Sequence, residues 1–128
     1  MSKILIIEDN AANMKLAVIA LEREGYEVLQ AKDAEAGVRL AQEQHPDLSL
    51  MDIHLPGMDG LAATRLLKGA AATRDIRIVA LTALAMVGDR EKIEAAGCDD
   101  YIAKPIRYRE FLKVVGDWLA RQAIVTTM

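Results

Sequence analysis

The sequence has few of the residues that mark special classes of protein. It contains one cysteine, Cys98, which excludes an internal disulfide and offers no zinc-ligand cluster, so we expect a buried structural thiol. No apolar run reaches the roughly 20 residues that a membrane-spanning helix requires, and no charged segment followed by an apolar one opens the chain. These absences predict a cytoplasmic protein with no membrane segment.

A basic face is also lacking. The formal net charge is -3, whereas nucleic-acid binding requires clustered basic residues. The chain shows no linker-like stretch rich in Ser, Pro or Gly, no repeat and no low-complexity segment. Its 128 residues, 52% hydrophobic and 27% charged, fit one globular domain. We therefore expect a single domain at residues 1–122, a C-terminal tail at 123–128, no attached output domain and no nucleic-acid partner.

Short apolar runs rich in β-branched residues alternate with longer segments of helical period. The runs predict five strands, at residues 4–7, 27–29, 48–51, 76–81 and 101–103. The later helical segments predict three helices, at about residues 59–69, 88–97 and 107–122. Strands that alternate with helices imply right-handed crossovers and a parallel sheet covered on both faces, which also explains why the strands are apolar throughout. The predicted fold class is a doubly wound α/β sandwich.

Two further helices lie in the first half of the chain. The first is predicted by apolar residues at positions i, i+3, i+4 and i+7, which are Met14, Ala17, Val18 and Leu21. Gly25 follows at the place where a C-terminal glycine is expected. The second helix is predicted between Asp33, which can cap its start, and Pro46, which forces the chain out of helical geometry.

Polar residues follow four of the predicted strands, at the edge where an open α/β sheet places its site. They are Glu8 and Asp9, Asp52, Thr82, and Lys104 with Pro105. Carboxylates about 4 Å apart repel by roughly 4 kcal/mol per pair at an effective dielectric near 20, so this cluster needs a cation, and Mg²⁺ suits oxygen ligands best. A carboxylate can attack phosphorus when positive charge offsets the repulsion between the two anions. A metal ion and Lys104 would supply that charge.

Several motifs on this chain carry a family resemblance. They are Glu8-Asp9-Asn10, MDIHLPGMDG at residues 51–60, Leu81-Thr82-Ala83 and DYIAKP at residues 100–105. In this order and spacing they resemble the response-regulator receiver domains of the CheY-like superfamily, over about residues 3–121. The segments at 9–16 and 83–89 are most similar to stand-alone cell-cycle receivers of the DivK type and to hybrid-kinase receivers. The resemblance implies a flavodoxin-like (βα)5 sandwich whose parallel strands lie in the order 2-1-3-4-5.

The resemblance also implies a role for each residue of the acidic cluster. Asp52 would be the phosphoryl acceptor, and Mg²⁺ would be bound by Asp9, Asp52 and the backbone carbonyl of His54, with Glu8 supporting the metal largely through water. A histidine kinase or a histidine phosphotransfer protein would donate the phosphoryl group. The chain would then be a signalling protein of a two-component system or phosphorelay rather than an enzyme. It would catalyse only its own phosphotransfer and a slow autodephosphorylation, which His54 and Leu84 would influence.

The remaining residues would form a switch. Lys104 would pair with the phosphate, aimed by a cis peptide bond before Pro105. Thr82 would donate its hydroxyl to a phosphate oxygen, and Tyr101 would swing from an exposed to a buried position in the space that the Thr82 loop vacates. The fourth helix, fifth strand and fifth helix would then form the output surface, which would control a downstream kinase or adaptor protein. The resting state is expected to be a monomer, with dimers on phosphorylation.

Three other functions fit parts of the pattern. A flavodoxin-like cofactor binder shares the strand order, but the acidic Glu8-Asp9 pair would repel the phosphate of a cofactor. A phosphatase of the haloacid dehalogenase type also uses an aspartyl nucleophile, Mg²⁺, a threonine and a lysine, but its first-strand Asp-x-Asp motif and its cap are missing. A receiver that has lost phosphorylation and acts only as a binding module is the third alternative, and the intact set of site residues argues against it.

Overall fold

The computed structural model of the chain describes residues 2–83 and 87–127, with side chains as far as residue 121. Five parallel strands form one sheet in the order β2-β1-β3-β4-β5. The strands are β1 (Lys3–Ile7), β2 (Glu27–Ala31), β3 (Leu48–Asp52), β4 (Arg77–Thr82) and β5 (Asp100–Ala103). The predicted doubly wound α/β class and the predicted strand order are confirmed.

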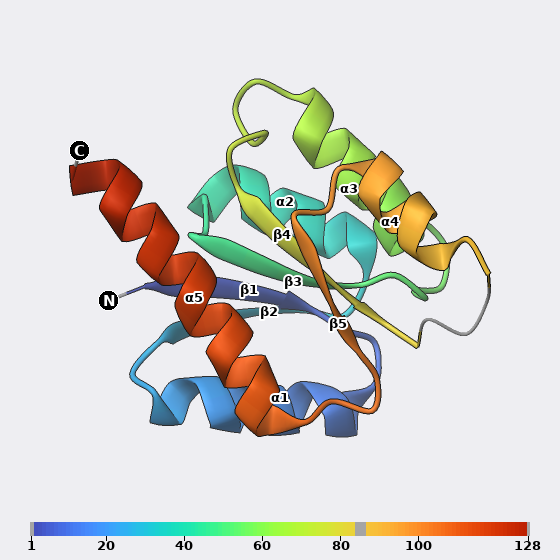
Figure 1. Cartoon of the computed structure of the whole chain (residues 1–128). Coiled ribbons are helices and arrows are strands. Elements are labelled where there is room, and N and C mark those ends of the chain that lie inside the picture. Colours follow the sequence, from blue (N-terminus) through green and yellow to red (C-terminus); the bar gives the residue numbers. More distant parts are fainter. Residues whose placement is uncertain (1, 84–86, 128) are drawn as a thin grey trace.

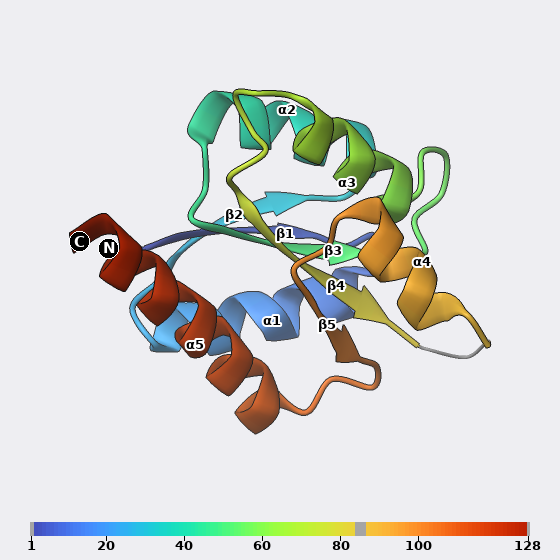
Figure 2. The same cartoon turned by 45° about the horizontal axis from the view of Figure 1, so that its top comes forward.

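Helices cover both faces of the sheet. They are α1 (Ala11–Arg23), α2 (Ala34–Gln44), α3 (Gly60–Gly69), α4 (Asp89–Ala96) and α5 (Tyr108–Thr127). Figures 1 and 2 show α1 and α5 on one face, α2 and α3 on the other, and α4 beside α3 at the β5 edge. Within the described part of the chain, no helix is both long and apolar enough to cross a membrane.

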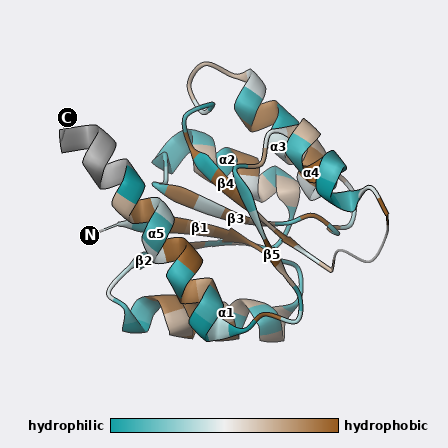
Figure 3. Cartoon of the chain, in the orientation of Figure 1, coloured by the Kyte–Doolittle hydropathy of each residue, from teal (hydrophilic) through white to brown (hydrophobic). Residues whose placement is uncertain are grey.

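Each face of the sheet has its own hydrophobic core. Alternate residues of β1 point to opposite sides, so that Ile6 packs with Leu21 and Phe111 beneath α1 and α5, and Ile7 packs with Leu67 beneath α2 and α3. The apolar residues of the strands and the inward faces of the helices are brown in Figure 3. All residues of β3 are buried, because this central strand has neighbours on both sides and helices on both faces.

Side-chain caps fix where three of the helices begin. Asn10, Asp33 and Asp59 each accept a hydrogen bond from the backbone N–H three residues on, at 2.9, 2.8 and 2.8 Å respectively. The predicted cap at Asp33 is therefore confirmed. Gly25, just beyond α1, has φ +87°, the left-handed conformation that favours glycine after a helix.

The far end of α5 differs from the sequence-based expectation. The helix continues to Thr127, beyond the end predicted at residue 122. No glycine or proline follows Gly116, so no residue in this stretch interrupts helical hydrogen bonding. The predicted tail at 123–128 is therefore helical over its described part, residues 123–127.

Asp99 anchors the amino-terminal ends of β4 and β5, away from the carboxyl ends of the strands. Its carboxylate accepts hydrogen bonds from the backbone N–H of Ile78 at 2.8 Å, from Lys68 Nζ at 2.9 Å and from Arg77 at 3.3 Å. Lys68 lies on α3 and also donates to the carbonyl oxygen of Ile76 at 2.8 Å. This cluster joins α3 to the β4 and β5 strands.

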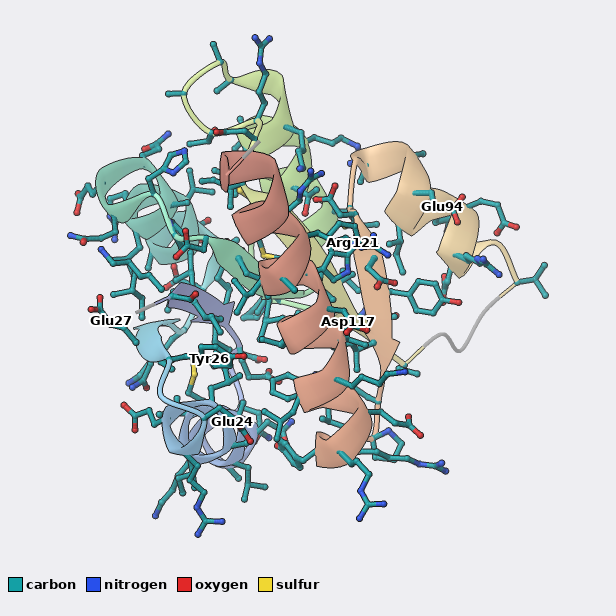
Figure 4. All side chains as sticks on the ribbon, turned by 60° about the vertical axis from the view of Figure 1, so that its left-hand side comes forward. Glu24, Tyr26, Glu27, Glu94, Asp117 and Arg121 are labelled. Carbon is teal, nitrogen blue, oxygen red and sulfur yellow. The ribbon has the colours of Figure 1, made fainter. Side chains whose placement is uncertain are left out.

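Trp118 attaches α5 to the start of β5. Its indole N–H donates to the carboxylate of Asp100 at 2.9 Å, and the guanidinium groups of Arg77 and Arg121 lie over its ring, at 5.5 and 4.5 Å from the ring centroid. Figure 4 labels Arg121 on the side of α5 that faces β5, and Tyr26 on the opposite side. The contact fixes the backbone that leads directly into Tyr101.

Candidate functional site

The residues predicted to form a site meet at the carboxyl edge of the sheet. Glu8 and Asp9 follow β1, Asp52 ends β3, Thr82 ends β4 and Lys104 follows β5. The three parallel strands β1, β3 and β4 are neighbours, and β5 pairs with β4, so their ends lie side by side. The fold therefore brings together residues that are as much as 96 positions apart in the sequence.

Three carboxylates form the acidic part of this cluster. Oxygen atoms of Glu8, Asp9 and Asp52 lie within 4.8 Å of one another. Glu8 and Asp52 are buried, with 3% and 2% of their surface exposed, while Asp9 is exposed. Two buried acids and one exposed acid leave the cluster open to solvent on the Asp9 side.

Lys104 bridges the two buried acids. Its Nζ lies 3.1 Å from Glu8 Oε1 and 3.0 Å from Asp52 Oδ2. The Lys104–Pro105 peptide bond is cis. With 24% of its side chain exposed, the lysine brings one positive charge into a site that holds three acids.

The charges of the site shift the pKa values of its members in opposite directions. Burial and the neighbouring Asp52 raise the pKa of Glu8 from 4.5 to about 7. Burial alone would raise the pKa of Asp52, but hydrogen bonds with Glu8, the His54 N–H and Lys104 outweigh it and hold that pKa below its usual value. Burial would lower the pKa of Lys104, yet its contacts with Asp52 and Glu8 raise it. At neutral pH the site therefore holds an ionised Asp52, a charged Lys104 and a Glu8 near its midpoint of titration.

The donor set fits a hard divalent cation. Carboxylate and carbonyl oxygens are the protein ligands that Mg²⁺ prefers, usually with one or two carboxylates and retained water. Three acids lie in the cluster against the single positive charge of Lys104. A bound Mg²⁺ would balance this excess of negative charge, and the exposed Asp9 leaves a route for its hydration shell.

The backbone after β3 is held by the Asp52 side chain. Asp52 Oδ1 accepts a hydrogen bond at 2.9 Å from the N–H of His54, whose side chain is exposed. The site residue Thr82 is completely buried and lies one position beyond Leu81, the β4 partner of Asp52 in the sheet. Leu84, the other residue expected to influence dephosphorylation, lies outside the described residues.

Tyr101 lies on β5 at the side of this site. Its ring is half-buried against Ile53, Ala80 and Ile93, and the guanidinium of Arg90 on α4 lies 5.7 Å from the ring centroid. The tyrosine therefore contacts both β4 and α4. Its position is intermediate between fully exposed and fully buried.

Two residues near the site were not given a role by the sequence pattern. Tyr108, at the start of α5, is partly buried, and burial together with the charge of Glu8 raises its pKa. Gly60, the first residue of α3, lies against the backbone of Asp52 and Ile53. Gly60 belongs to the motif at residues 51–60, so the sequence does mark the position. Its contact with the backbone of Asp52 and Ile53 is seen only in the folded chain.

Cys98 is separate from these site residues. It is partly buried, and its Sγ lies 3.8 Å from the hydroxyl of Thr64. Burial raises the pKa of its thiol, so the thiol stays protonated at neutral pH. This environment agrees with a structural rather than a reactive cysteine.

Solved structures of similar fold include receiver domains from distant organisms. The receiver domain of a sensor histidine kinase from Pseudomonas aeruginosa is 39% identical, with a TM-score of 0.86 over 93% of this chain and 98% of that one. That structure has a magnesium ion coordinated in its active site cleft. A CheY-like receiver domain protein from Methanospirillum hungatei is 29% identical, with a TM-score of 0.88 over 96% of this chain and 97% of that one.

Sequence comparison agrees with the structural comparison. The polar-differentiation response regulator DivK of Brucella ovis is 43% identical over 116 residues, which cover 91% of this chain and 94% of that protein. The family model described as the response regulator receiver domain matches residues 4–116. These matches agree with the acidic cluster, the neighbouring lysine and the strand order of the fold. The chain therefore belongs to the response regulator receiver domain family and is a signalling protein of the DivK type.

Proposed function

We propose that the chain accepts a phosphoryl group on Asp52 and that this modification changes its affinity for partner proteins. The observation that carries the proposal is the state of the Asp52 carboxylate. It is 2% exposed, its pKa is below the usual value, and Lys104 Nζ lies 3.0 Å from one of its oxygens. A buried carboxylate that stays ionised beside a positive charge can act as a nucleophile toward phosphorus.

The phosphoryl donor in the cell is a histidine kinase or a histidine phosphotransfer protein, the partners that a receiver domain implies in general. An oxygen of Asp52 attacks the phosphorus of a phosphohistidine, and the O–P bond forms while the P–N bond breaks. The imidazole nitrogen keeps the electron pair of the broken bond and takes up a proton from solvent. Lys104 already contacts Asp52 and Glu8, so its charge can pair with the new phosphoryl oxygens without a large movement.

The same site supports Mg²⁺ as a cofactor. Asp9, Asp52 and the backbone carbonyl of His54 would hold the ion, with Glu8 behind them. When bound, the ion supplies positive charge that offsets the repulsion between the carboxylate and the phosphoryl oxygens. The ionised Asp52 and the excess of acids over bases in the cluster support this assignment.

The output surface is the face formed by α4, β5 and α5. A groove of about 320 Å³ between β5 and α5 is lined by both Tyr101 and Lys104, and by Arg107, Glu110 and Val114 of the neighbouring segment. Thr82 would donate its hydroxyl to the phosphate, and Tyr101 would turn inward. Hydrogen bonds to charged groups contribute about 1.5 to 3 kcal/mol each, so two or three of them approach the roughly 5.5 kcal/mol needed to reverse a 1:99 population.

The partner on this face is a downstream kinase or adaptor protein, and the setting is a cytoplasmic phosphorelay. Residues 1–122 would form the receiver domain and residues 123–128 its C-terminal tail. The resting state would be a monomer that dimerises on phosphorylation, and a slow autodephosphorylation would return the protein to that state. The DivK relative, a polar-differentiation response regulator, supports a role in the cell cycle.

Intact-mass analysis after incubation with acetyl phosphate tests the proposal. With Mg²⁺, the chain should gain the mass of one phosphoryl group, and Asp52→Asn should gain none. Asp75→Asn is the matched control, because Asp75 is an exposed carboxylate with 72% of its side chain accessible, on the loop before β4. An adduct of equal amount on Asp52→Asn, or none on the unmodified chain, would contradict the assignment.

A further inference from the structure

Gly60 begins α3 and lies directly against the end of the acceptor strand. A Cβ atom built on Gly60 would overlap the carbonyl oxygen of Asp52 and would lie 2.7 Å from the Cα of Ile53. The N–H of Gly60 also donates to the carbonyl oxygen of Ile53 at 3.3 Å. The start of the helix is therefore as close to the backbone of Asp52 and Ile53 as a residue without a side chain allows.

The atoms that such a Cβ would meet are backbone atoms, which cannot turn aside as a flexible side chain can. Real Cβ contacts essentially never fall below 3.0 Å, so either β3 or α3 would have to move. The helix is held in place by Ala63 and Leu67, which are buried in the core beneath α2 and α3, and by Lys68, which donates to Asp99 at 2.9 Å. Part of the displacement would therefore fall on the strand end.

Backbone conformation does not by itself demand glycine at this position. Gly60 has none of the positive φ angles found at Gly25, Gly57, Gly88 and Gly97, and the first turn of a helix accepts most residue types. Close approach to Asp52 is thus the feature that excludes a side chain. The backbone that an added methyl group would displace carries the Asp52 side chain. It also leads to His54, whose N–H donates to the Asp52 carboxylate at 2.9 Å.

We propose that Gly60 is a positioning residue for the acceptor site, which sets the place of the Asp52 carboxylate and of the His54 backbone by letting α3 approach β3 without a side chain between them. This inference rests on the proposed function, because the site it adjusts is the proposed phosphoryl-acceptor and Mg²⁺ site. Displacement of a reacting group by about 1 Å can lower a rate about 100-fold. A single methyl group at Gly60 is expected to have an effect of that order.

Three alanine variants separate positioning from stability. Gly60→Ala places the methyl group against the acceptor backbone. Gly69→Ala lies at the other end of the same helix, where nothing stands within 4 Å of an added Cβ. Gly37→Ala, on α2, meets the side chain of Ile7 at 2.5 Å, so it disturbs core packing without touching the backbone of Asp52.

For each variant we would measure urea stability, Mg²⁺ affinity by titration calorimetry and the rate of phosphorylation by acetyl phosphate. Gly60→Ala should bind Mg²⁺ about tenfold more weakly and be phosphorylated about 100-fold more slowly, under conditions where it is fully folded. Gly37→Ala should lose stability but keep both site properties, and Gly69→Ala should keep all three. Mg²⁺ binding is a readout that does not depend on phosphorylation.

Two results would overturn the inference: a Gly60→Ala variant that behaves as Gly69→Ala does, or a Gly37→Ala variant with the same loss of Mg²⁺ affinity. If Gly60→Ala does not fold, Thr64→Val tests the position of the first turn of α3 instead, since it keeps the shape of the side chain and removes the hydroxyl that donates to the Gly60 carbonyl oxygen. A severalfold weaker Mg²⁺ affinity is expected there, and an unchanged affinity contradicts the inference. Failure of the unmodified chain to bind Mg²⁺ or to be phosphorylated would instead contradict the proposed function.

Discussion

Removal of the positive charge of Lys104 should destabilise the protein in a way that depends on pH and on Mg²⁺. Lys104 Nζ lies 3.1 Å from Glu8 and 3.0 Å from Asp52. At an effective dielectric of 20 each attraction is worth about 5 kcal/mol before desolvation is subtracted, and the acids repel one another by about 3 kcal/mol. Replacement by methionine keeps most of the apolar stem and leaves two buried carboxylates without a counter-charge.

The expected loss for Lys104→Met is about 3 kcal/mol of unfolding free energy at pH 8 without metal, the lower end of the range for breaking a buried ion pair. At pH 5 the loss should fall to about half, because Glu8, with a pKa of about 7, is then neutral and Lys104 is paired with Asp52 alone. Addition of Mg²⁺ at pH 8 should also reduce the loss, since the ion would replace the missing positive charge.

Urea unfolding followed by the fluorescence of Trp118, the single tryptophan, would measure these differences. Lys113→Met on the exposed side of α5 is the matched control and should change the unfolding free energy by less than about 0.5 kcal/mol. Equal losses for Lys104→Met at pH 5 and pH 8, with no effect of Mg²⁺, would refute the electrostatic reasoning. They would assign the loss to the packing of the lysine stem instead.

Three further predictions concern Glu8, Ser49 and Trp118. Without metal, the unfolding free energy should fall by up to about 3 kcal/mol as pH rises from 4.5 to about 7, because folded Glu8 keeps a proton that the unfolded chain releases. Urea midpoints would show this fall, and Glu8→Gln should abolish it. Ser49→Ala should raise stability by about 0.5 to 1 kcal/mol in thermal unfolding, since the buried Ser49 hydroxyl has no hydrogen-bond partner among the described residues and its desolvation is uncompensated. Trp118→Phe should cost about 1 kcal/mol in differential scanning calorimetry by removing the indole donor to Asp100, and an unchanged melting temperature would contradict it.

The strands could be predicted closely because each is a short apolar run between polar segments. The predicted run at residues 48–51 became β3, which ends one residue later at Asp52, and the run at 76–81 became β4, which is shifted by one residue at each end. Such differences arise because hydrogen-bond pairing with neighbouring strands, not side-chain apolarity, decides where a strand ends. Register and sheet order needed the family resemblance as well as the pattern.

The site was predictable to the level of which residues meet, since parallel strands deliver their carboxyl ends to one edge. The pKa of Glu8 was not predictable, because it depends on burial and on a distance to Asp52 that only the folded chain defines. Lys68 was missed for a similar reason. In the sequence it is an ordinary helical lysine, yet it reaches Asp99 from 31 positions away.

The attachment of α4 differs from that of β3, the strand that ends at Asp52. Ile93 and Ala96 are its only buried residues, whereas every residue of β3 is buried. In native-state hydrogen exchange, segments with few buried apolar contacts open at low free energy, and central strands exchange near the global unfolding free energy. The amides of α4 should therefore exchange by local opening long before those of β3. Under the proposed function, phosphorylation would act at the end of β3, a unit that opens slowly, and α4 would be a separate unit that can rearrange without unfolding that strand.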